Sequence, residues 1–277
     1  MVRAALILIV GMAFVPLGDS AGKLLVEDHG VAPIFVAWSR FLLGALLILP
    51  FLRPAHLGAA YFLDWRLWFR GALISLGVVS ILTALQTEPL ANVFGAFFSG
   101  PILSYVLSVL LLGERVTVAR TMLILVGFLG VLLVIRPGFG VTPGLGFAVL
   151  AGAFYGAYLV SSRAFAAAAP PQSLLITQLV AGAILMAPFG VTAVPTPSGS
   201  VAALVVMSAA SSAIGNLLLV LAYARAPATR LAPFIYFQLI AATAYGWGIF
   251  GDLPDAVTFA GLGLLVASGF GSLGLRR

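Results

Sequence analysis

The sequence predicts an all-α membrane protein whose ten transmembrane helices form two inverted five-helix repeats. Three observations support this fold class: a very apolar composition, ten long apolar runs, and an internal repeat that relates the two halves of the chain. Apolar residues make up 62% of the 277 residues, charged residues make up 8%, and the mean hydropathy is +1.18. A soluble domain carries about a quarter charged residues because its surface faces water. Most of this protein's surface must therefore face lipid.

Ten apolar runs, separated by polar or turn-forming connections, are each long enough to cross a bilayer. A helix needs about 20 residues to span about 30 Å of hydrocarbon. The first run imitates a signal peptide, because Arg3 precedes it and Asp19-Ser20-Ala21 lies near its end, but the repeat gives this run a counterpart inside the chain. We therefore count it as a span. In chain order the predicted spans are Ala4–Leu24, Ala32–Leu52, Leu67–Leu85, Leu90–Leu112, Val118–Ile135, Leu145–Ser162, Gln172–Val191, Val201–Ala222, Ala228–Phe250 and Ala256–Leu273.

Basic residues between the spans gather on one side of the predicted membrane. When alternate connections are assigned to opposite sides, one side holds Lys23 and Arg136, while Arg40 lies within the second span. Positive charge marks the cytoplasmic side. Both termini are therefore expected in the cytoplasm, and the membrane is expected to be a bacterial inner membrane. An odd number of spans would place basic residues of the two groups on the same side. The cytoplasmic group comprises Arg3, Arg53, Arg66, Arg70, Arg115, Arg120, Arg163, Arg225, Arg230, Arg276 and Arg277.

The chain aligns with itself at an offset of 138 residues, without a gap from the first span to the fourth. Matched prolines carry the most weight, because Pro fixes where helices begin and bend. The predicted repeats are residues 1–138 and 139–277. Each contains an odd number of spans, so the halves must be related by a pseudo-two-fold axis in the membrane plane, as in many transporters that work by alternating access. Aligned pairs include Gly18 with Gly156, Pro33 with Pro171, Pro50 with Pro188, Pro89 with Pro227 and Gly113 with Gly251.

The composition excludes several functional classes. The chain has no Cys and only two His, which are far apart, so thiolate sites and histidine metal sites are not expected. No nucleotide-binding loop, catalytic triad or metal-ligand cluster is found, and we expect no cofactor, no metal and no enzymatic activity. The net charge of +6 is not clustered, which argues against a nucleic-acid partner. A secondary transporter is the prediction; a lipid scramblase or a channel-like facilitator is the alternative, ahead of a membrane-embedded enzyme.

Several short motifs recur along the two halves of the chain: Lys23, Pro33, Trp38-Ser39-Arg40, Pro101, Leu112-Gly113-Glu114-Arg115, Tyr236-Phe237-Gln238 and Phe250-Gly251-Asp252. In their order and spacing, the chain resembles the EamA family of the drug/metabolite transporter superfamily over essentially its whole length. The resemblance implies two tandem five-helix units, cytoplasmic termini, and a central cavity from which the fifth and tenth helices are excluded. It also implies a substrate among small metabolites, including amino acids and related compounds, with export as the usual direction. The second half departs from the pattern at Leu239, which stands opposite Pro101, and at Asp252, which stands opposite Glu114.

Charged residues within the spans are the strongest candidates for function. Such a charge costs at least about 2.5–3.5 kcal/mol on insertion scales, so Asp19 and Arg40 need partners or water. Asp19 and Lys23 lie at i and i+4 on one helical face. One interpretation is a cluster of Asp19, Lys23 and Arg40 that binds a zwitterion or responds to protons, with Asp19 as the proton-coupling candidate and Lys23 as its charge partner. The other is a salt-bridged pin between the first two helices, with Lys23 extending outward. The repeat places Gln178 opposite Arg40 and Ala157 opposite Asp19, so the charge belongs to one half.

Aromatic and amide side chains within the spans complete the predicted site. A cavity with aromatic walls and few polar groups suits an apolar or aromatic metabolite with a small charged end. For each mid-span Tyr, packing between helices is an equal alternative. The predicted substrate-binding residues are Asp19, Arg40, Asn92, Tyr105, Tyr155, Tyr158, Gln178, Tyr236 and Gln238.

Small residues recur at four-residue spacing on the tenth span, at Gly263, Ala267 and Gly271. Such a stripe lets two helices approach closely. We expect it to form the seam with a neighbouring helix of the same chain, with a dimer interface as the alternative. The expected partners are thus a small-molecule substrate and the lipid bilayer, and the choice between monomer and homodimer stays open.

Overall fold

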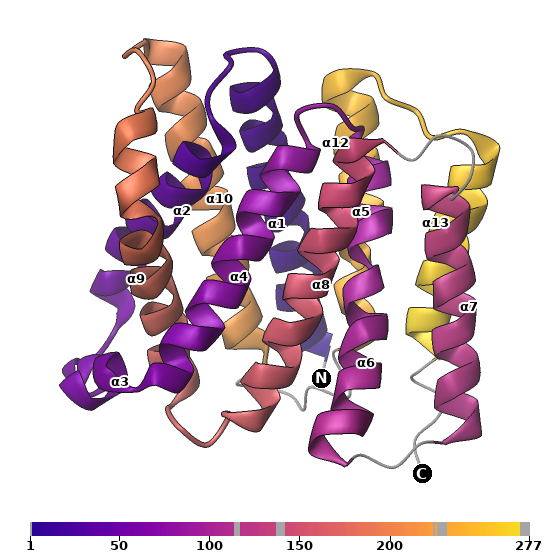
Figure 1. The fold of residues 1–277 in the computed structure, drawn as a ribbon, viewed down its shortest axis with the longest axis horizontal. Helices are drawn as coiled ribbons and strands as arrows, with labels where there is room; N and C mark the ends of the chain where they lie inside the picture. The colour runs from indigo at the N-terminus through magenta and orange to yellow at the C-terminus, as the bar shows by residue number, and fades with distance from the viewer. Residues whose placement is uncertain (1, 114–116, 137–141, 224, 226–231, 272–277) are drawn as a thin grey trace.

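A computed structural model describes residues 2–113, 117–136, 142–223, 225 and 232–271 as a bundle of helices that run side by side (Figure 1). The predicted boundary between the repeats, at residues 138 and 139, lies outside the described residues. So do Glu114, Arg115, Arg230, Arg276 and Arg277, the start of the predicted ninth span and the end of the tenth.

The helices follow the predicted apolar runs closely, and the all-α membrane fold is confirmed. Seven described segments are long and apolar enough to cross a membrane, and three shorter apolar helices accompany them. A short helix, α3, which the hydropathy did not predict, joins the second and third spans. The elements are α1 (Val2–Glu27), α2 (Pro33–Ile48), η1 (Leu49–Phe51), η2 (Pro54–Leu57), α3 (Ala59–Leu63), α4 (Trp65–Ala84), α5 (Leu90–Phe97), α6 (Ser99–Leu112), α7 (Val118–Ile135), α8 (Pro143–Ala164), α9 (Pro171–Gly190), η3 (Val191–Ala193), α10 (Gly199–Tyr223), η4 (Ala232–Tyr236), α12 (Phe237–Phe250) and α13 (Ala256–Gly271).

The fourth span, predicted as one continuous helix, is broken at Phe98 into α5 and α6. The backbone of Phe98 leaves the helical region, with ψ at 3°. Pro101 explains the break, because a proline has no N–H to donate to the carbonyl four residues earlier, here that of Phe97. The hydropathy of the run gave no sign of the interruption, since both pieces are apolar.

The ninth span is interrupted at the corresponding position, where the 3₁₀ segment η4 gives way to α12 at Tyr236. Tyr236 lies 138 residues after Phe98. Leu239 stands in the place of Pro101, so the second unit has no proline at the position that breaks the fourth span. The helices α6 and α12 then end alike, on Gly113 and Gly251 with φ of 65° and 73°, a left-handed conformation that favours glycine at a helix C-terminus.

Helix packing follows the same two-fold relation. The contact of α1 with α10 has its repeat equivalent in the contact of α8 with α4. Likewise, the contact of α2 with α10 is equivalent to that of α9 with α4. The contact of α12 with α1 is equivalent to that of α6 with α8. Two pairs are their own counterparts, namely α2 with α9 and α7 with α13. Figure 1 shows α7 and α13 side by side at one edge of the bundle. Helices of the two halves therefore interleave, and the packing agrees with an inverted repeat.

The seam between α7 and α13 depends on glycines other than the predicted ones. Gly263 and Ala267 are exposed, so the prediction that they form the seam is wrong; of the three, only Gly271 approaches α7. A Cβ on Gly261 would lie 2.7 Å from the backbone oxygen of Gly130, and a Cβ on Gly130 would lie 2.7 Å from that of Gly261. The face of α13 that contacts α7 includes Gly261, two residues before Gly263. The four-residue spacing predicted a close helix contact but not which way the helix is rotated.

Replacing Gly261 with leucine is expected to destabilise the protein, because the backbone of α7 leaves no room for a side chain. Overpacking of this kind costs about 1–3 kcal/mol. Gly263→Leu is the matched control on the same helix, since nothing lies within 4 Å of its Cβ position. Thermal unfolding in detergent checks this pair. Equal melting temperatures for the two variants would contradict the packing of α13 described above.

Candidate functional site

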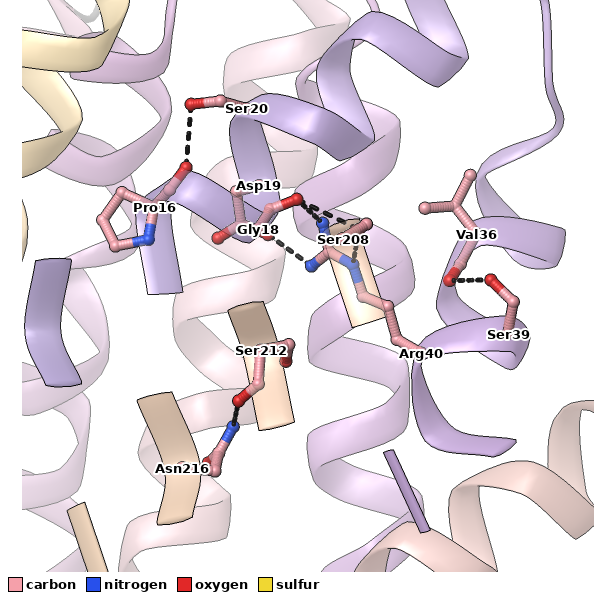
Figure 2. Close-up of polar contacts among 10 residues, drawn as sticks. All are labelled: Pro16, Gly18, Asp19, Ser20, Val36, Ser39, Arg40, Ser208, Ser212 and Asn216. Carbon is pink, nitrogen blue, oxygen red and sulfur yellow. Dashed lines mark hydrogen bonds and ion pairs between the residues drawn. The ribbon is translucent and has the colours of Figure 1, made fainter. Parts of the chain in front are cut away.

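Asp19 and Arg40 form a buried ion pair in the seam where α1, α2 and α10 meet (Figure 2). The Arg40 Nη1 atom lies 2.5 Å from Asp19 Oδ1, and the two side chains are 6% and 4% exposed. Arg40 Nε donates to the Ser208 hydroxyl at 2.6 Å, and Nη2 donates to the Gly18 carbonyl at 2.6 Å. Each guanidinium nitrogen has a partner, and the charge is balanced. We call Asp19, Arg40, Ser208 and Gly18 the outer cluster.

The backbone of α1 is shaped to admit this guanidinium. A Cβ on Gly22 would lie 2.5 Å from Arg40 Nη2, and a Cβ on Gly18 would lie 3.0 Å from the Ser208 carbonyl oxygen. Glycine at both positions lets α2 and α10 approach the helix closely. The Ser208 hydroxyl also donates to the Gly18 carbonyl, at 3.0 Å. The outer cluster therefore ties two helices of the first half to one of the second.

Lys23 lies apart from this pair, although the sequence placed it on the same face as Asp19. Its ammonium pairs with Glu27 at 3.1 Å, lies 4.0 Å from Asp252, and donates to the Glu88 carbonyl at 2.9 Å. It also lies 5.1 Å from the centroid of the Phe250 ring. Lys23 thus connects the end of α1 to the beginning of α5 and the end of α12. The predicted cluster of three charges is divided into two groups.

A second polar group lies where α4, α8 and α9 meet; we call Arg70, Tyr158, Ser162 and Gln178 the inner cluster. Arg70 donates to Ser162 from Nε at 3.0 Å and to the Tyr158 hydroxyl from Nη2 at 3.3 Å. Tyr158 in turn donates to Gln178 Oε1 at 2.7 Å. The guanidinium lies 5.2 Å from the centroid of the Tyr158 ring, a distance suited to a cation–π contact.

The two clusters occupy equivalent places in the two halves. At the 138-residue offset, Arg40 corresponds to Gln178 and Ser208 corresponds to Arg70. Each cluster therefore holds one arginine, but on a different helix of the trio. Asp19 corresponds to Ala157, so the acid that balances the outer guanidinium has no equivalent in the inner cluster.

An aromatic row runs from the inner cluster to the interruptions of the two discontinuous spans. Ring centroids are 6.1 Å apart for Tyr158 and Tyr155, and 4.8 Å apart for Tyr155 and Phe97. The row continues from Phe97 to Phe98 at 6.1 Å and from Phe98 to Tyr236 at 4.9 Å. Phe98 and Tyr236 are equivalent in the repeat, so their contact lies at the pseudo-two-fold axis.

The other predicted site residues lie elsewhere. The Tyr105 hydroxyl is 3.0 Å from the Thr121 hydroxyl, in the contact between α6 and α7. Gln238 is buried near the start of α12. Asn92 lines a cavity of about 430 Å³ whose polar walls include Glu88, Thr142 and Asp252. The structure therefore brings together Asp19 with Arg40, and Tyr155, Tyr158 and Gln178 with one another, but not all nine residues.

A surface ion pair lies at the rim of this cavity, between the end of α7 and the beginning of α13. Arg136 donates to both carboxylate oxygens of Asp255. This hydrogen bonding lowers the pKa of the Asp255 carboxyl, and the Thr258 N–H contributes in the same direction. Since the folded-state pKa is depressed, the stability that the pair contributes is present above about pH 4 and is lost only as the pH falls further.

Arg70 is the main residue that the sequence reasoning misplaced. It was counted among the cytoplasmic connection charges, yet it lies six residues into α4 and is only 3% exposed. Ser208 was not among the predicted site residues. The repeat could have identified both, because it aligns Arg70 with Ser208 and so places Arg70 at the depth of a polar position in the second half.

Comparison with known proteins identifies relatives along nearly the whole chain. The model of the EamA-like transporter family matches residues 2–136 and again residues 142–273. A riboflavin transporter of Rhizobium johnstonii is 28% identical, covering 80% of this chain and 75% of its own. An S-adenosylmethionine uptake transporter of Rickettsia bellii is 25% identical (83% and 80%), and a pseudopaline exporter of Pseudomonas aeruginosa is 28% identical (84% and 83%). A solved crystal structure with 21% identity superposes with a TM-score of 0.64 over 99% of this chain and 96% of that chain, which shows a shared fold.

Proposed function

Since the chain belongs to the EamA-like transporter family and is an integral membrane transporter of small metabolites, we propose that it carries aromatic or amphipathic metabolites by alternating access. Amino acids and related compounds are included in this class. The proposed location is a bacterial inner membrane with both termini in the cytoplasm, as the distribution of Lys and Arg favours. The proposed repeats are the two halves, residues 1–138 and 139–277.

The observation that carries the proposal is the aromatic row of Tyr158, Tyr155, Phe97, Phe98 and Tyr236. It reaches the interruptions of two discontinuous spans on the pseudo-two-fold axis. In transporters built from inverted repeats, substrate sites lie near the midplane at broken helices between the repeats. Riboflavin and S-adenosylmethionine, named for two of the relatives, both contain a heteroaromatic ring system that could stack on such a row.

The direction of transport does not follow from family membership. The relatives include an uptake transporter and an exporter, and a carrier moves substrate in the direction that its driving gradient dictates. Export stays a prediction, as does proton coupling through Asp19. If protons are coupled there, Asp19→Asn abolishes the pH dependence of transport in proteoliposomes; unchanged pH dependence in that variant removes Asp19 from the coupling.

Counterflow in proteoliposomes tests the carrier mechanism. Labelled aromatic amino acids and riboflavin are the first probes, and at least one is expected to accumulate transiently and saturably against unlabelled compound inside.

Tyr155→Ala is expected to raise the apparent KM about tenfold, as loss of about 1–1.5 kcal/mol of ring contacts would do, whereas Tyr155→Phe keeps the ring and serves as the matched control. Non-saturable flux without counterflow would instead indicate a channel-like facilitator, and transfer of labelled lipid would indicate a scramblase.

A further inference from the structure

Arg70 is a buried charge that no acid among the described residues balances. No ion pair joins it to any Asp or Glu within the described ranges. Its Nη1 atom is buried and has no hydrogen-bond partner. Its neighbours Tyr158 and Ser162 are neutral hydroxyls that accept from the other two nitrogens.

The outer cluster holds an arginine whose charge and hydrogen bonds are satisfied within the protein. Arg40, in the equivalent outer cluster, has an acid at 2.5 Å and a partner for every nitrogen. Leaving a buried guanidinium uncompensated is costly, and ionisable groups that persist inside membrane proteins mark substrate or ion sites. The outer cluster has Asp19 where the inner cluster has Ala157, and this difference distinguishes the two clusters.

We propose that Arg70 binds the carboxylate of an aromatic substrate, a step that rests on the proposed function and names the substrate class. Nη1 supplies an unused N–H donor, and the Ser162 hydroxyl, which accepts from Arg70, still has its own proton to donate. A carboxylate accepts both. A single guanidinium balances a single negative charge, which favours a monocarboxylate over a phosphate dianion.

The aromatic row determines where the ring of the substrate would lie. The guanidinium lies over the Tyr158 ring, and next along the row come the rings of Tyr155 and Phe97. A substrate whose carboxylate binds Arg70 therefore lays its ring along these side chains, toward the interruptions at Phe98 and Tyr236. Arg70 is 3% exposed, so the carboxylate reaches it when α4, α8 and α9 part, a movement that alternating access requires at this end of the bundle.

Stability of the empty protein gives a first test that needs no ligand. Arg40→Gln removes a balanced charge and is expected to lower the melting temperature markedly. Arg70→Gln removes an unbalanced one and is expected to leave the melting temperature unchanged or raised. If Arg70→Gln destabilises the protein as much as Arg40→Gln does, Arg70 is a structural pin and the proposal is wrong.

Ligand selectivity gives the second test, read as thermal stabilisation of purified protein. The probes are indole-3-acetate and L-tryptophan as aromatic carboxylates, indole-3-acetamide as the neutral partner, cyclohexylacetate as a carboxylate without an aromatic ring, and phenyl phosphate. The wild type is expected to bind an aromatic carboxylate about tenfold or more tightly than the amide or cyclohexylacetate, as a charge-assisted hydrogen bond allows. Arg70→Gln abolishes the preference over the amide, Arg70→Lys restores part of it, and Arg66→Gln, an exposed arginine on the same helix, keeps it.

The outcomes separate this inference from the function on which it rests. A wild type that prefers none of the carboxylates, that prefers phenyl phosphate, or whose preference survives in Arg70→Gln overturns the assignment of Arg70. Absence of counterflow for every probe, with carboxylate binding intact, overturns the carrier function and leaves the binding site in place. Counterflow that is present and unaltered in Arg70→Gln overturns the site and leaves the carrier in place.

Discussion

Arg40→Gln is expected to destabilise the folded protein by about 3–5 kcal/mol, the cost of removing one partner from a buried ion pair. Asp19 would be left as an unpaired carboxylate with a side chain only 4% exposed. The Gly18 carbonyl and the Ser208 hydroxyl would each lose the guanidinium donor that binds them. Glutamine is the informative replacement, because Gln178 is the residue that the other half carries at this position. Equilibrium unfolding in mixed micelles measures the loss.

The double variant Asp19→Asn/Arg40→Gln is the matched control. Replacing both partners by neutral groups removes the stranded charge, and such exchanges are often close to neutral. The double variant is therefore expected to recover most of the stability that Arg40→Gln loses. If both variants are equally unstable, the charge balance between Asp19 and Arg40 is not what holds α1, α2 and α10 together.

Hydropathy located the spans well, because the cost of burying charge in lipid is read directly from composition. It could not resolve the interruption at Phe98, since an apolar helix and an apolar broken helix have the same hydropathy. Pro101 carried the local signal in the first unit, and Leu239 stands in its place in the second unit. The repeat, which relates Phe98 to Tyr236, was the observation from which both interruptions could have been inferred together.

The candidate site was predicted only in part, because spacing along a helix does not determine which neighbours a long side chain reaches. Asp19 and Lys23 share a helical face, yet Lys23 lies one turn nearer the end of α1 and reaches Glu88 and Asp252. Arg70 was counted with the basic residues of one side of the membrane, but its side chain turns inward to Tyr158. Such choices depend on the rotation of each helix, which is fixed by packing.

Locking α1 to the α12–α13 connection is expected to stop transport almost completely. The carboxylates of Glu27 and Asp252 both lie within 4.0 Å of the Lys23 ammonium, and both side chains are accessible at 42% and 36% exposure. The pair joins the first half to the second at the end of the bundle opposite the start of α1. If alternating access separates α1 from α12 at this end, a covalent link between these two helices holds it closed.

A short, reducible bis-thiosulfonate linker across Glu27→Cys/Asp252→Cys makes the link, and the absence of native cysteine removes background reaction. Arg136→Cys/Asp255→Cys is the matched control, because it joins α7 to α13, a pair already packed together at one edge of the bundle. Single-cysteine variants treated with the same reagent show the effect of modification without a link.

Counterflow through the cross-linked Glu27→Cys/Asp252→Cys protein is the measurement that tests the carrier account most directly. The account predicts that flux falls to the level of empty liposomes when the link forms and returns when a reducing agent cleaves it, while the Arg136→Cys/Asp255→Cys protein keeps transporting. Full transport by a completely cross-linked Glu27→Cys/Asp252→Cys protein would contradict an alternating-access mechanism in which α1 and α12 part at this end.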